Sequence, residues 1–304
     1  KLGGLDFIDL RDRTGIMQVV FGEEINAEAF EKAKSVKPEY CIAVTGEVVK
    51  RESVNENMPT GFVELKCESI KILSESETPP IIIKENLDTA EDIRLKYRYL
   101  DLRRPDMFKI FETRSKTTAA IRSYLDNHGF LDVETPVLGK STPEGARDYL
   151  VPSRNYNGMF YALPQSPQLF KQLLMMSGFD KYYQIAKCFR DEDLRADRQI
   201  EFTQVDVEMS FLSTDRILEI GEGMIAKVMH DVKGIDIELP LRRLTWHEAM
   251  EKYGIDKPDT RFGLELVNLN HIVADVDFAV FKNALEAHGH VKGINVVAQA
   301  QEFS

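Results

Sequence analysis

One stretch of the chain, from Lys187 to Phe211, concentrates side chains that could do chemistry at the turn of a predicted hairpin. The first strand of this hairpin, predicted from Tyr182 to Phe189, delivers Arg190 and Glu192 to the rim of the turn. A planar guanidinium group meets phosphate and carboxylate oxygens through paired hydrogen bonds. An arginine at the end of this strand therefore indicates a site for an anion.

The second strand of the hairpin is predicted from Glu201 onward, because its side chains alternate in polarity. One face carries Thr203, Val205, Val207, Met209 and Phe211, and the other carries Phe202, Gln204, Asp206 and Glu208. The pattern predicts a core face and a face with polar groups in a row. A half-buried antiparallel hairpin with a solvated face alternates in the same way, so a purely structural interpretation stays open on this pattern alone.

Two sequence motifs favour the chemical interpretation. FRDE at Phe189–Glu192 and RQIEFTQVD at Arg198–Asp206 resemble motif 2 of the class II aminoacyl-tRNA synthetases, and the whole stretch is similar to the bacterial aspartyl group. The resemblance implies that Arg190 is the catalytic residue, which holds the α-phosphate of ATP beside the amino acid carboxylate. It also implies that Phe202 stacks on the purine. The residues that it assigns to ATP are Arg190, Asp191, Glu192, Gln199 and Phe202.

The segment LPQSPQLFKQLLMMSG predicts a helix that starts at Ser166 and Pro167 and stops at Gly178. Gln168 and Lys171 are three residues apart and are therefore expected on one face of this helix. A lysine on an amphipathic helix is commonly a surface residue whose charge reaches the solvent. QSPQLFKQ, however, resembles the aspartyl family closely, which implies that this lysine pairs with the side-chain carboxylate of aspartate.

The same resemblance implies which residues surround the amino acid. Glu144 lies in the turn-rich segment STPEGARD and matches a residue that holds the substrate ammonium group on a closing loop. Without that match it would be an ordinary solvated glutamate. Asp206 is expected to orient Lys171 or to join the same network. The residues assigned to L-aspartate are Glu144, Ser166, Gln168, Lys171, Arg190 and Asp206.

A long helix is predicted from Phe108 to His128, with Gly129 as its C-terminal stop. Its apolar face is expected to hold Ile110, Thr117, Ile121, Tyr124 and Leu125. The helix runs into GFLDVETP, Gly129–Pro136, which resembles motif 1 of the class and implies a homodimer through this motif. A helix followed by a strand is common, so the weight of motif 1 comes from its position before motif 2.

Residues 1–74 are predicted to be rich in β-structure, with a turn at Arg13–Gly15, a short helix at Ala27–Lys34 and a bend at Gly46. Strands are predicted at Phe7–Asp12, Ile16–Phe21, Glu39–Lys50 and Phe62–Leu73. Four or five short strands with one helix predict a small barrel of the OB-fold type.

An aromatic side chain is expected on the polar face of the first strand, because Ile8 and Leu10 share the apolar face and leave Phe7 on the other. Such a ring can stack on an unpaired base, although isolated exposed aromatic residues are common. Residues 1–74 are similar to the anticodon-binding domain of the aspartyl, asparaginyl and lysyl group. The resemblance implies that Phe7 and Gln18 contact the middle base of the anticodon. It also implies that Arg195 and Arg198 contact the acceptor end of the tRNA.

The formal net charge of −11 argues against a nucleic-acid partner, but net charge does not report how charge is distributed. Nine basic residues lie between Arg94 and Arg122 against three acidic ones. A solvated helical face and an RNA-facing patch both remain open for this run. Residues 75–105, which include SESETPP, are predicted to be a hinge with a helix from Ala90 to Leu100 capped by Asp88 or Thr89.

The composition of the chain indicates what kind of protein it is. With 43% hydrophobic and 29% charged residues, it has the composition of a soluble globular protein. Cys41, Cys67 and Cys188 are far apart and predict neither a zinc site nor a disulfide framework. No apolar run approaches the about 20 residues that a membrane helix needs. We therefore expect a cytoplasmic protein with no membrane partner.

The predicted fold class is α+β, in four parts of the 304 residues. These are an OB-fold β-barrel at 1–74, a hinge at 75–105, an incomplete class II catalytic domain with an antiparallel sheet at 106–261, and the start of an inserted α+β domain at 262–304. No segment after Phe211 resembles motif 3, which would supply a further arginine and the metal ligands. We expect a fragment that forms little aspartyl-adenylate alone.

The resemblance implies ATP-dependent ligation of L-aspartate to tRNA(Asp) through an aspartyl-adenylate, with ATP as substrate and Mg²⁺ as cofactor. It leaves open whether tRNA(Asn) is also charged. One alternative is a catalytically silent RNA-binding or regulatory protein, which is consistent with the missing motif 3. Another is a synthetase-derived enzyme that forms a small amide, but such an enzyme has no use for an anticodon domain.

Overall fold

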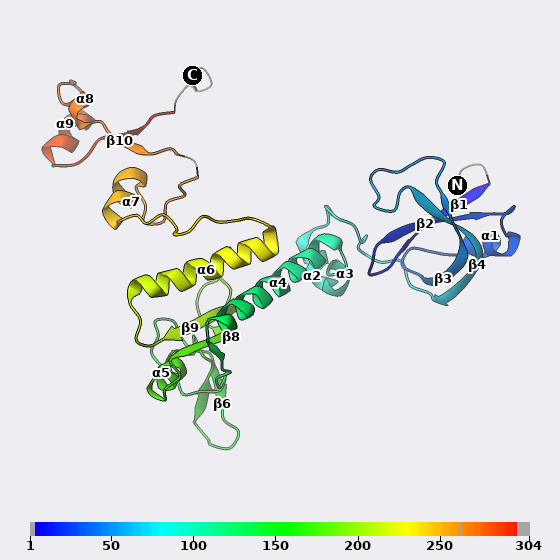
Figure 1. Ribbon diagram of the computed structural model, residues 1–304, viewed down its shortest axis with the longest axis horizontal. Coiled ribbons are helices and arrows are strands. Elements are labelled where there is room, and N and C mark those ends of the chain that lie inside the picture. Colours follow the sequence, from blue (N-terminus) through cyan, green and yellow to red (C-terminus); the bar gives the residue numbers. More distant parts are fainter. Residues whose placement is uncertain (1–3, 262, 297–304) are drawn as a thin grey trace. The chain divides into compact units, whose positions relative to one another are not determined.

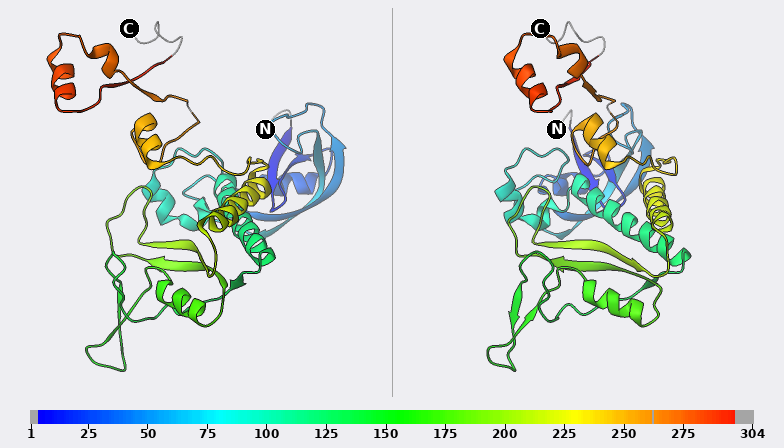
Figure 2. Two further views of the ribbon diagram at one scale, coloured as in Figure 1. Left: turned by 60° about the vertical axis from the view of Figure 1, so that its left-hand side comes forward. Right: turned by 90° about the vertical axis from the view of Figure 1, so that its left-hand side faces the viewer.

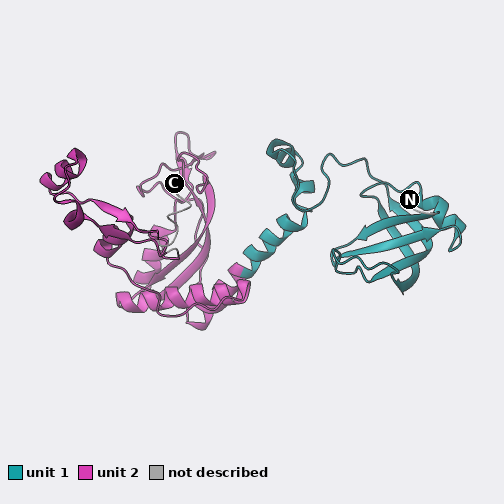
Figure 3. Ribbon diagram, turned by 90° about the horizontal axis from the view of Figure 1, so that it is seen from above, with its two compact units in different colours: residues 1–116 teal, residues 117–304 magenta. Residues whose placement is uncertain are grey.

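The computed structural model describes residues 4–261 and 263–296. The chain divides into two compact units, residues 1–116 and residues 117–304 (Figure 3). The predicted start of an inserted domain at 262–304 includes residue 262 and residues 297–304, which lie outside the described part of the chain.

The first unit is built on a four-stranded sheet of order β1-β2-β4-β3 (Figure 1). The strands are β1 (Leu5–Arg11), β2 (Ile16–Gly22), β3 (Cys41–Lys50) and β4 (Val63–Ser74). Antiparallel pairs join β1 to β2 and β3 to β4, whereas β2 and β4 run parallel. The four strands predicted from sequence are confirmed to within two residues at each end.

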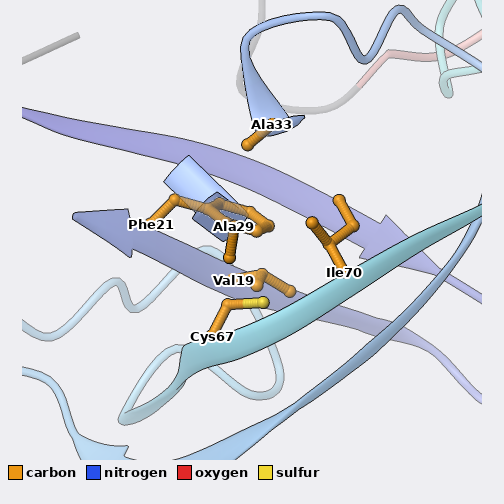
Figure 4. Close-up of a cluster of buried hydrophobic side chains, with 6 residues drawn as sticks. All are labelled: Val19, Phe21, Ala29, Ala33, Cys67 and Ile70. Atoms are coloured by element: carbon orange, nitrogen blue, oxygen red, sulfur yellow. The ribbon is translucent and has the colours of Figure 1, made fainter. Parts of the chain in front are cut away.

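Small and apolar side chains form the core between this sheet and helix α1 (Ala27–Ala33) (Figure 4). The core residues are Val19, Phe21, Ala29, Ala33, Cys67 and Ile70. Ile8 and Leu10 of β1 pack against this core, as their predicted face requires. Asn26 starts α1 because its side chain accepts a hydrogen bond from the Ala29 amide at 2.9 Å. Because Ile8 and Leu10 face this core, the opposite face of β1 is left for polar contacts.

Gly46 marks the bend predicted in β3. The register of β3 against β4 shifts between Thr45 and Gly46. A Cβ atom at Gly46 would lie 1.9 Å from the Lys66 carbonyl oxygen, a distance that no side chain can accept. Glycine is therefore required here for the close approach of two backbones.

The segment between the barrel and the long helix is packed rather than extended. Ile81 and Ile83 are buried, although they belong to the predicted hinge. The single helix expected there is wrong, because two helices, α2 (Glu91–Lys96) and α3 (Arg98–Asp101), meet at Tyr97, whose φ of −108° and ψ of 45° interrupt the helical path. The expected cap is also wrong, since Ala90 occupies that position without a side-chain hydrogen bond.

Helix α4 (Pro105–Asn127) matches the predicted long helix. Proline is tolerated in its first turn, and Gly129 with a φ of +77° follows its end. Ile121 and Leu125 are buried as expected. Ile110 is 59% exposed, so the predicted apolar face does not reach the first turns.

The second unit is built on a three-stranded sheet of order β5-β8-β9. The strands are β5 (Leu131–Asp132), β8 (Lys181–Phe189) and β9 (Glu201–Met209), and β8 and β9 form the predicted antiparallel hairpin. Helices α4 and α6 (Thr214–Lys233) cover one face of the sheet, and α5 (Gln168–Met176) lies on the other (Figure 2). The core under α4 and α6 consists of Ile121, Leu125, Phe130, Tyr183 and Ile220.

The alternation predicted for β9 holds over part of the strand. Val207 and Met209 pack against the core under α4 and α6, so they occupy the predicted core face. Val205 is 36% exposed and Phe211 is 96% exposed, so placing these two in the core was wrong. Phe211 lies beyond the end of β9 and has a φ of +58°, which ends the alternation of an extended strand.

The remaining elements extend the second unit. Strands β6 (Leu150–Pro152) and β7 (Phe160–Ala162) form a hairpin, and β10 (Leu266–Asn268) pairs with β11 (Lys292–Ile294). Helix α7 (Trp246–Tyr253) begins with a capping box between Thr245 and Glu248. The last helices are α8 (Asn270–Val273) and α9 (Ala279–Glu286). Within the described residues, no helix is long and apolar enough to cross a membrane.

Candidate functional site

A buried ion pair lies on the polar face of the β8-β9 hairpin, under α5. Lys171 Nζ donates to Asp206 Oδ1 at 2.9 Å and lies 3.3 Å from Glu208 Oε2. Gln204 Nε2 also donates to Asp206 Oδ1, at 3.1 Å. Asp206 is only 2% exposed, so this polar face is as well covered as the core face. The structure thus brings together Lys171 and Asp206, which the sequence predicts to share a network.

The surroundings favour a charged lysine at this position. Burial opposes charge on Lys171, but the carboxylates of Asp206 and Glu208 outweigh burial and raise the pKa of its ammonium group. Burial, together with the Asp206 charge, raises the pKa of the Tyr182 phenol, which therefore stays neutral. Asp206 Oδ2 is buried and finds no hydrogen-bond partner among the described residues. The network has polar capacity left for a ligand.

Helix α5 presents Lys171 because Pro167 and the turn at Gly178 fix its two ends. Pro167 is the residue before the first helical residue, and Gly178 has a φ of +85° just after the last turn. The Phe179 amide then donates to the Leu174 carbonyl at 3.0 Å and closes the helix end. Gln168, the first residue of α5, is exposed. Among the described residues, no hydrogen bond joins Gln168 to the ion pair, so its predicted role stays a prediction.

A guanidinium group stacks on an aromatic ring at the open end of the hairpin. The Arg190 guanidinium carbon lies 5.1 Å from the centre of the Phe202 ring. The Arg190 amide donates to the Ile200 carbonyl at 2.9 Å, which continues the pairing beyond β8. Arg190 Nε is buried and has no hydrogen-bond partner among the described residues. A cation with a spare buried donor next to an aromatic face is suited to an anion that carries a flat ring.

Cys188, which pairs across the hairpin with Phe202, is fully buried beside this arginine. Burial and the charge of Asp206 raise the pKa of its thiol to about 11. A thiol with such a pKa is protonated near neutral pH and is a poor nucleophile. Cys188 is therefore a packing residue of the hairpin.

Glu144 and Ser166 meet beside the start of α5. Ser166 Oγ donates to Glu144 Oε2 at 2.8 Å. Both residues line a small cavity of about 40 Å³ together with Asp148 and Phe170. The structure therefore brings Glu144 to the segment that carries Lys171, as the sequence predicts for one amino acid site.

Gln165 was missed by the sequence analysis. Its side chain is 3% exposed, donates to the Ala146 carbonyl at 2.8 Å and accepts from the Ala146 amide at 3.1 Å. It also donates to Asp148 Oδ1. Gln165 thus holds the loop of Glu144 against the segment before α5. No periodic pattern marks it, because its role depends on a loop 19 residues away.

The loop between β8 and β9 carries the remaining predicted residues of this region. The Asp191 amide donates to the Arg147 carbonyl at 3.0 Å, so this position contacts the Glu144 loop through its backbone. Arg195 and Arg198 pair through their backbones, and both side chains are exposed, as is Gln199. Glu192 is half-buried at the rim. These positions suit a surface for a larger partner.

A second candidate site is a groove of about 860 Å³ in the first unit. Phe7 and Gln18 both line it, and Phe7 is 42% exposed. Gln18 Nε2 donates to Glu64 Oε2 at 3.0 Å, and Arg51 Nη1 is buried without a hydrogen-bond partner among the described residues. An exposed ring beside amide and guanidinium groups matches the chemistry of an unpaired base.

Within residues 4–261 and 263–296, no group of three or more His, Cys, Asp or Glu side chains could hold a metal ion. The three cysteines are free thiols, and Cys67 and Cys188 are buried. The sequence analysis left the metal ligands unknown, and the described residues add none.

Family models match almost the whole chain. Residues 90–297 match the model described as tRNA synthetases class II (D, K and N). Residues 1–73 match the model described as OB-fold nucleic acid binding domain. These matches confirm the predicted fold class of an OB-fold joined to a class II synthetase domain.

Curated relatives and solved structures agree with the family models. The chain is 76% identical over 294 residues to an aspartate–tRNA ligase of Clostridium botulinum and 74% identical to one of Clostridium beijerinckii, covering 97% of this chain and 49% of each of those proteins. It is similar to an asparaginyl-tRNA synthetase from Pyrococcus horikoshii complexed with asparaginyl-adenylate, with a TM-score of 0.66 and 26% identity over 77% of this chain and 52% of that one. The chain spans about half the length of the curated relatives that it matches.

Proposed function

The chain belongs to the class II tRNA synthetases of the D, K and N group, and we propose that it is the part of an aspartate–tRNA ligase that binds ATP, aspartate and the anticodon. Two contacts carry this proposal: the Lys171–Asp206 pair between α5 and β9, and the contact of Arg190 with Phe202 on the same β8-β9 hairpin. Lys171 is a cation that can pair with a carboxylate, and Arg190 with the Phe202 ring can bind the phosphate and the base of a nucleotide. The relatives that match are named as ligases for aspartate.

For the amino acid, we propose that Lys171 pairs with the side-chain carboxylate of L-aspartate. The raised pKa of its ammonium group keeps it charged. Asp206 orients the lysine and prevents an uncompensated buried cation when the site is empty. Glu144, held by Ser166, receives the α-ammonium group of the substrate. Ser166 and Gln168 are assigned to the backbone groups of the amino acid.

For ATP, we propose that Arg190 holds the α-phosphate while the purine lies on Phe202. The buried Nε of Arg190 without a partner supports this assignment, because a buried donor is costly until an acceptor arrives. The ring of Phe202 offers the apolar face on which the purine stacks. Asp191, Glu192 and Gln199, along the same loop, are assigned to the rest of the nucleotide.

The reaction then needs little acid-base catalysis. The α-carboxylate of aspartate is ionised near neutral pH and attacks the α-phosphorus of ATP, so that a new P–O bond forms. The bond to the β-phosphate breaks, and pyrophosphate leaves with that electron pair. A hydroxyl group of the terminal adenosine of tRNA next attacks the aspartyl carbonyl and forms the ester C–O bond. The bond between that carbonyl carbon and the phosphate oxygen breaks, AMP leaves with its electron pair, and the hydroxyl proton is released to solvent. Arg190 stabilises the charge that develops on the α-phosphate.

Mg²⁺ is the metal expected for this chemistry. When bound, such an ion neutralises phosphate charge. The described residues do not fit a metal site, because they contain no cluster of candidate ligands. No step above is therefore assigned to the metal.

For partners, we propose tRNA(Asp) as the RNA, with Phe7 and Gln18 at the anticodon and Arg195 and Arg198 at the acceptor end. The groove that Phe7 and Gln18 line supports the first assignment. A homodimer through motif 1, at residues 129–136, is a further part of the proposal, and the charging assay below decides between strict use of tRNA(Asp) and additional use of tRNA(Asn). A cytoplasmic location follows from the role in translation and agrees with three free cysteines.

Two assays test the proposal. A full-length protein that carries this chain should attach L-aspartate to tRNA(Asp), and parallel charging of tRNA(Asn) measures how strict the RNA choice is. We expect the 304-residue chain alone to support little aspartate-dependent pyrophosphate exchange, since it lacks a segment resembling motif 3. Robust exchange by the chain alone would contradict that expectation. Absence of charging by the full-length protein would favour the silent regulatory alternative.

A further inference from the structure

A shared carboxylate joins three segments of the first unit. Arg11, the last residue of β1, donates through Nη2 to the two Glu39 carboxylate oxygens at 2.8 and 2.9 Å. Arg11 Nη1 also donates to the Ile83 carbonyl at 3.3 Å. Arg103, between α3 and α4, places its Nη2 2.8 Å from Glu39 Oε2. We name Arg11, Glu39 and Arg103 the barrel clamp.

The backbone at Glu39 is unusual for a residue with a side chain. Its φ is +67°, which lies in the left-handed region that glycine and asparagine tolerate best. The Glu39 side chain is 18% exposed and meets both arginines. A strained position that holds a partly buried, doubly paired carboxylate points to a requirement for that carboxylate.

The residues beside Glu39 fasten the connector as well. Ser76 Oγ donates to the Pro38 carbonyl at 3.2 Å, and the Tyr40 hydroxyl donates to Glu75 Oε2 at 3.4 Å. Ile81 in the same connector is 1% exposed. The segment that the sequence predicts to be a hinge is therefore held against the barrel at several points.

The clamp reaches a rigid start of α4. Arg104, next to Arg103, is 4% exposed and lies 3.1 Å from Asp101, which is fully buried. Arg104 also pairs with Asp106 in the first turn of α4. Because the Arg104–Asp101 pair is buried, the chain next to Arg103 has little freedom. The barrel clamp thus acts on the first turn of the helix rather than on a loose linker.

The same strand carries the clamp and the groove. Phe7 and Arg11 are four residues apart in β1 and so share one face, about 13 Å apart along the strand. Phe7 lines the groove assigned to the anticodon. A base bound at Phe7 and the start of α4 are therefore connected through one strand and one carboxylate.

We propose that Glu39 is a positioning residue that locks the barrel to the connector and to the start of α4 within the first unit, and that the enzyme uses RNA held in the groove less efficiently when this lock is lost. The RNA part rests on the proposed function. The clamp is distinct from the residues assigned to adenylation. Its loss should therefore affect the use of tRNA and leave the reaction of aspartate with ATP intact.

The first test measures the clamp directly by hydrogen exchange in the 304-residue chain. Glu39→Gly removes the carboxylate and relieves the positive φ, so the barrel itself should fold at least as well. We expect amides of residues 75–86 and 98–104 to exchange at least tenfold faster, with β3 and β4 unchanged. Arg103→Ala should act in the same way. Glu31→Gln, which breaks the exposed Glu31–Lys34 pair on α1, is the control. Unchanged exchange in Glu39→Gly would overturn the clamp.

The second test uses a full-length protein that carries the chain. Glu39→Gly should raise KM for tRNA at least fivefold and leave aspartate-dependent pyrophosphate exchange within twofold of the parent. Equal loss of both activities, or loss of neither, would overturn the positioning role. If the unaltered full-length protein lacks exchange, the proposed function fails, whereas the hydrogen-exchange result still decides whether the clamp exists.

Discussion

The groove of the first unit and the hairpin site of the second unit differ in their exposure and in their charge. The groove is wide, about 860 Å³, and presents the partly exposed ring of Phe7 with the amide of Gln18. The hairpin site holds a buried ion pair, Lys171 with Asp206, and Asp206 is only 2% exposed. An open surface suits a large and flexible polymer. A covered, charged site suits small anions whose charge must be matched.

The difference also divides specificity between the units. Stacking on an exposed ring tolerates every base, so selectivity in the groove depends on neighbouring hydrogen-bond groups such as Gln18 and Glu64. In the hairpin site a misplaced charge is costly, because little water can screen it. Substitutions in the hairpin should therefore have larger effects than substitutions in the groove.

The largest effect is expected at the buried pair. Lys171→Met leaves Asp206 buried without its cation and should destabilise the second unit by about 3–5 kcal/mol. The matched control is Lys187→Met, which breaks the Lys187–Glu201 pair on the same hairpin, where both side chains are more than half exposed. That control should cost less than about 1 kcal/mol. Chemical denaturation of the chain measures both, and equal losses would show that burial does not distinguish the pairs.

The next effect is expected at the cation assigned to the phosphate. Arg190→Ala in a full-length protein that carries the chain should lower aspartate-dependent pyrophosphate exchange by about 10²–10³-fold, since a positioned group that stabilises developing charge is lost. Arg190→Lys keeps the charge without the planar fork and should recover part of the rate. Exchange rates with saturating aspartate measure this. A rate for Arg190→Ala within a factor of five of the parent would remove Arg190 from the reaction.

Loss of an aromatic face should have a moderate effect that differs between the two regions. Phe202→Ala should raise KM for ATP by about 5–150-fold, equivalent to the roughly 1–3 kcal/mol that a base gains by stacking. Its KM for tRNA should stay unchanged. A change in KM for tRNA without a change in KM for ATP would place the Phe202 ring outside the nucleotide site.

Phe7→Ala is the corresponding change in the groove. It should raise KM for tRNA by a smaller factor, about 5–20-fold, because other contacts along the RNA remain. Pyrophosphate exchange without tRNA should be unaffected. A parallel charging assay with Phe62→Ala, an exposed aromatic residue outside the residues that line the groove, controls for general loss of apolar surface. Equal effects of the two substitutions would argue against a specific role for Phe7.

The smallest effect is a dependence of stability on alkaline pH. The pKa of Lys171 is raised from its ordinary value of 10.5, so its contribution is fully present below that pH and is lost as pH rises through the higher folded-state pKa. Burial, with Asp126 as a hydrogen-bond partner, also raises the pKa of Tyr183 to about 12, which acts in the same direction. Stability should therefore fall between about pH 10 and 12. Lys171→Met should show a shallower fall, and an identical slope would contradict the assignment.

Much of the fold could be predicted from sequence, because periodicity reports local structure directly. The four strands of the barrel, the helix of Lys171 and the hairpin all lie close to their expected bounds. The break at Tyr97 could not be predicted, since the residues around it favour helix and only the backbone angles show the interruption. Phe211 was misplaced because the alternation was extended past the end of the strand.

The site was partly accessible to sequence. The sequence predicts that Lys171 and Asp206 share one network, and they form an ion pair in the structure. The roles of Gln165 and of the barrel clamp could not be predicted from sequence, because each joins segments that are far apart in the chain. Arg11 and Arg103 are separated by 92 positions, and nothing local to either residue shows that both meet Glu39.

Selection of aspartate by the buried Lys171 can be measured by comparing pyrophosphate exchange with L-aspartate and with L-asparagine in a full-length protein that carries this chain. We expect aspartate to be preferred by at least about 100-fold, because asparagine leaves Lys171 without its carboxylate partner in a covered site. Equal exchange with both amino acids would contradict this role of Lys171.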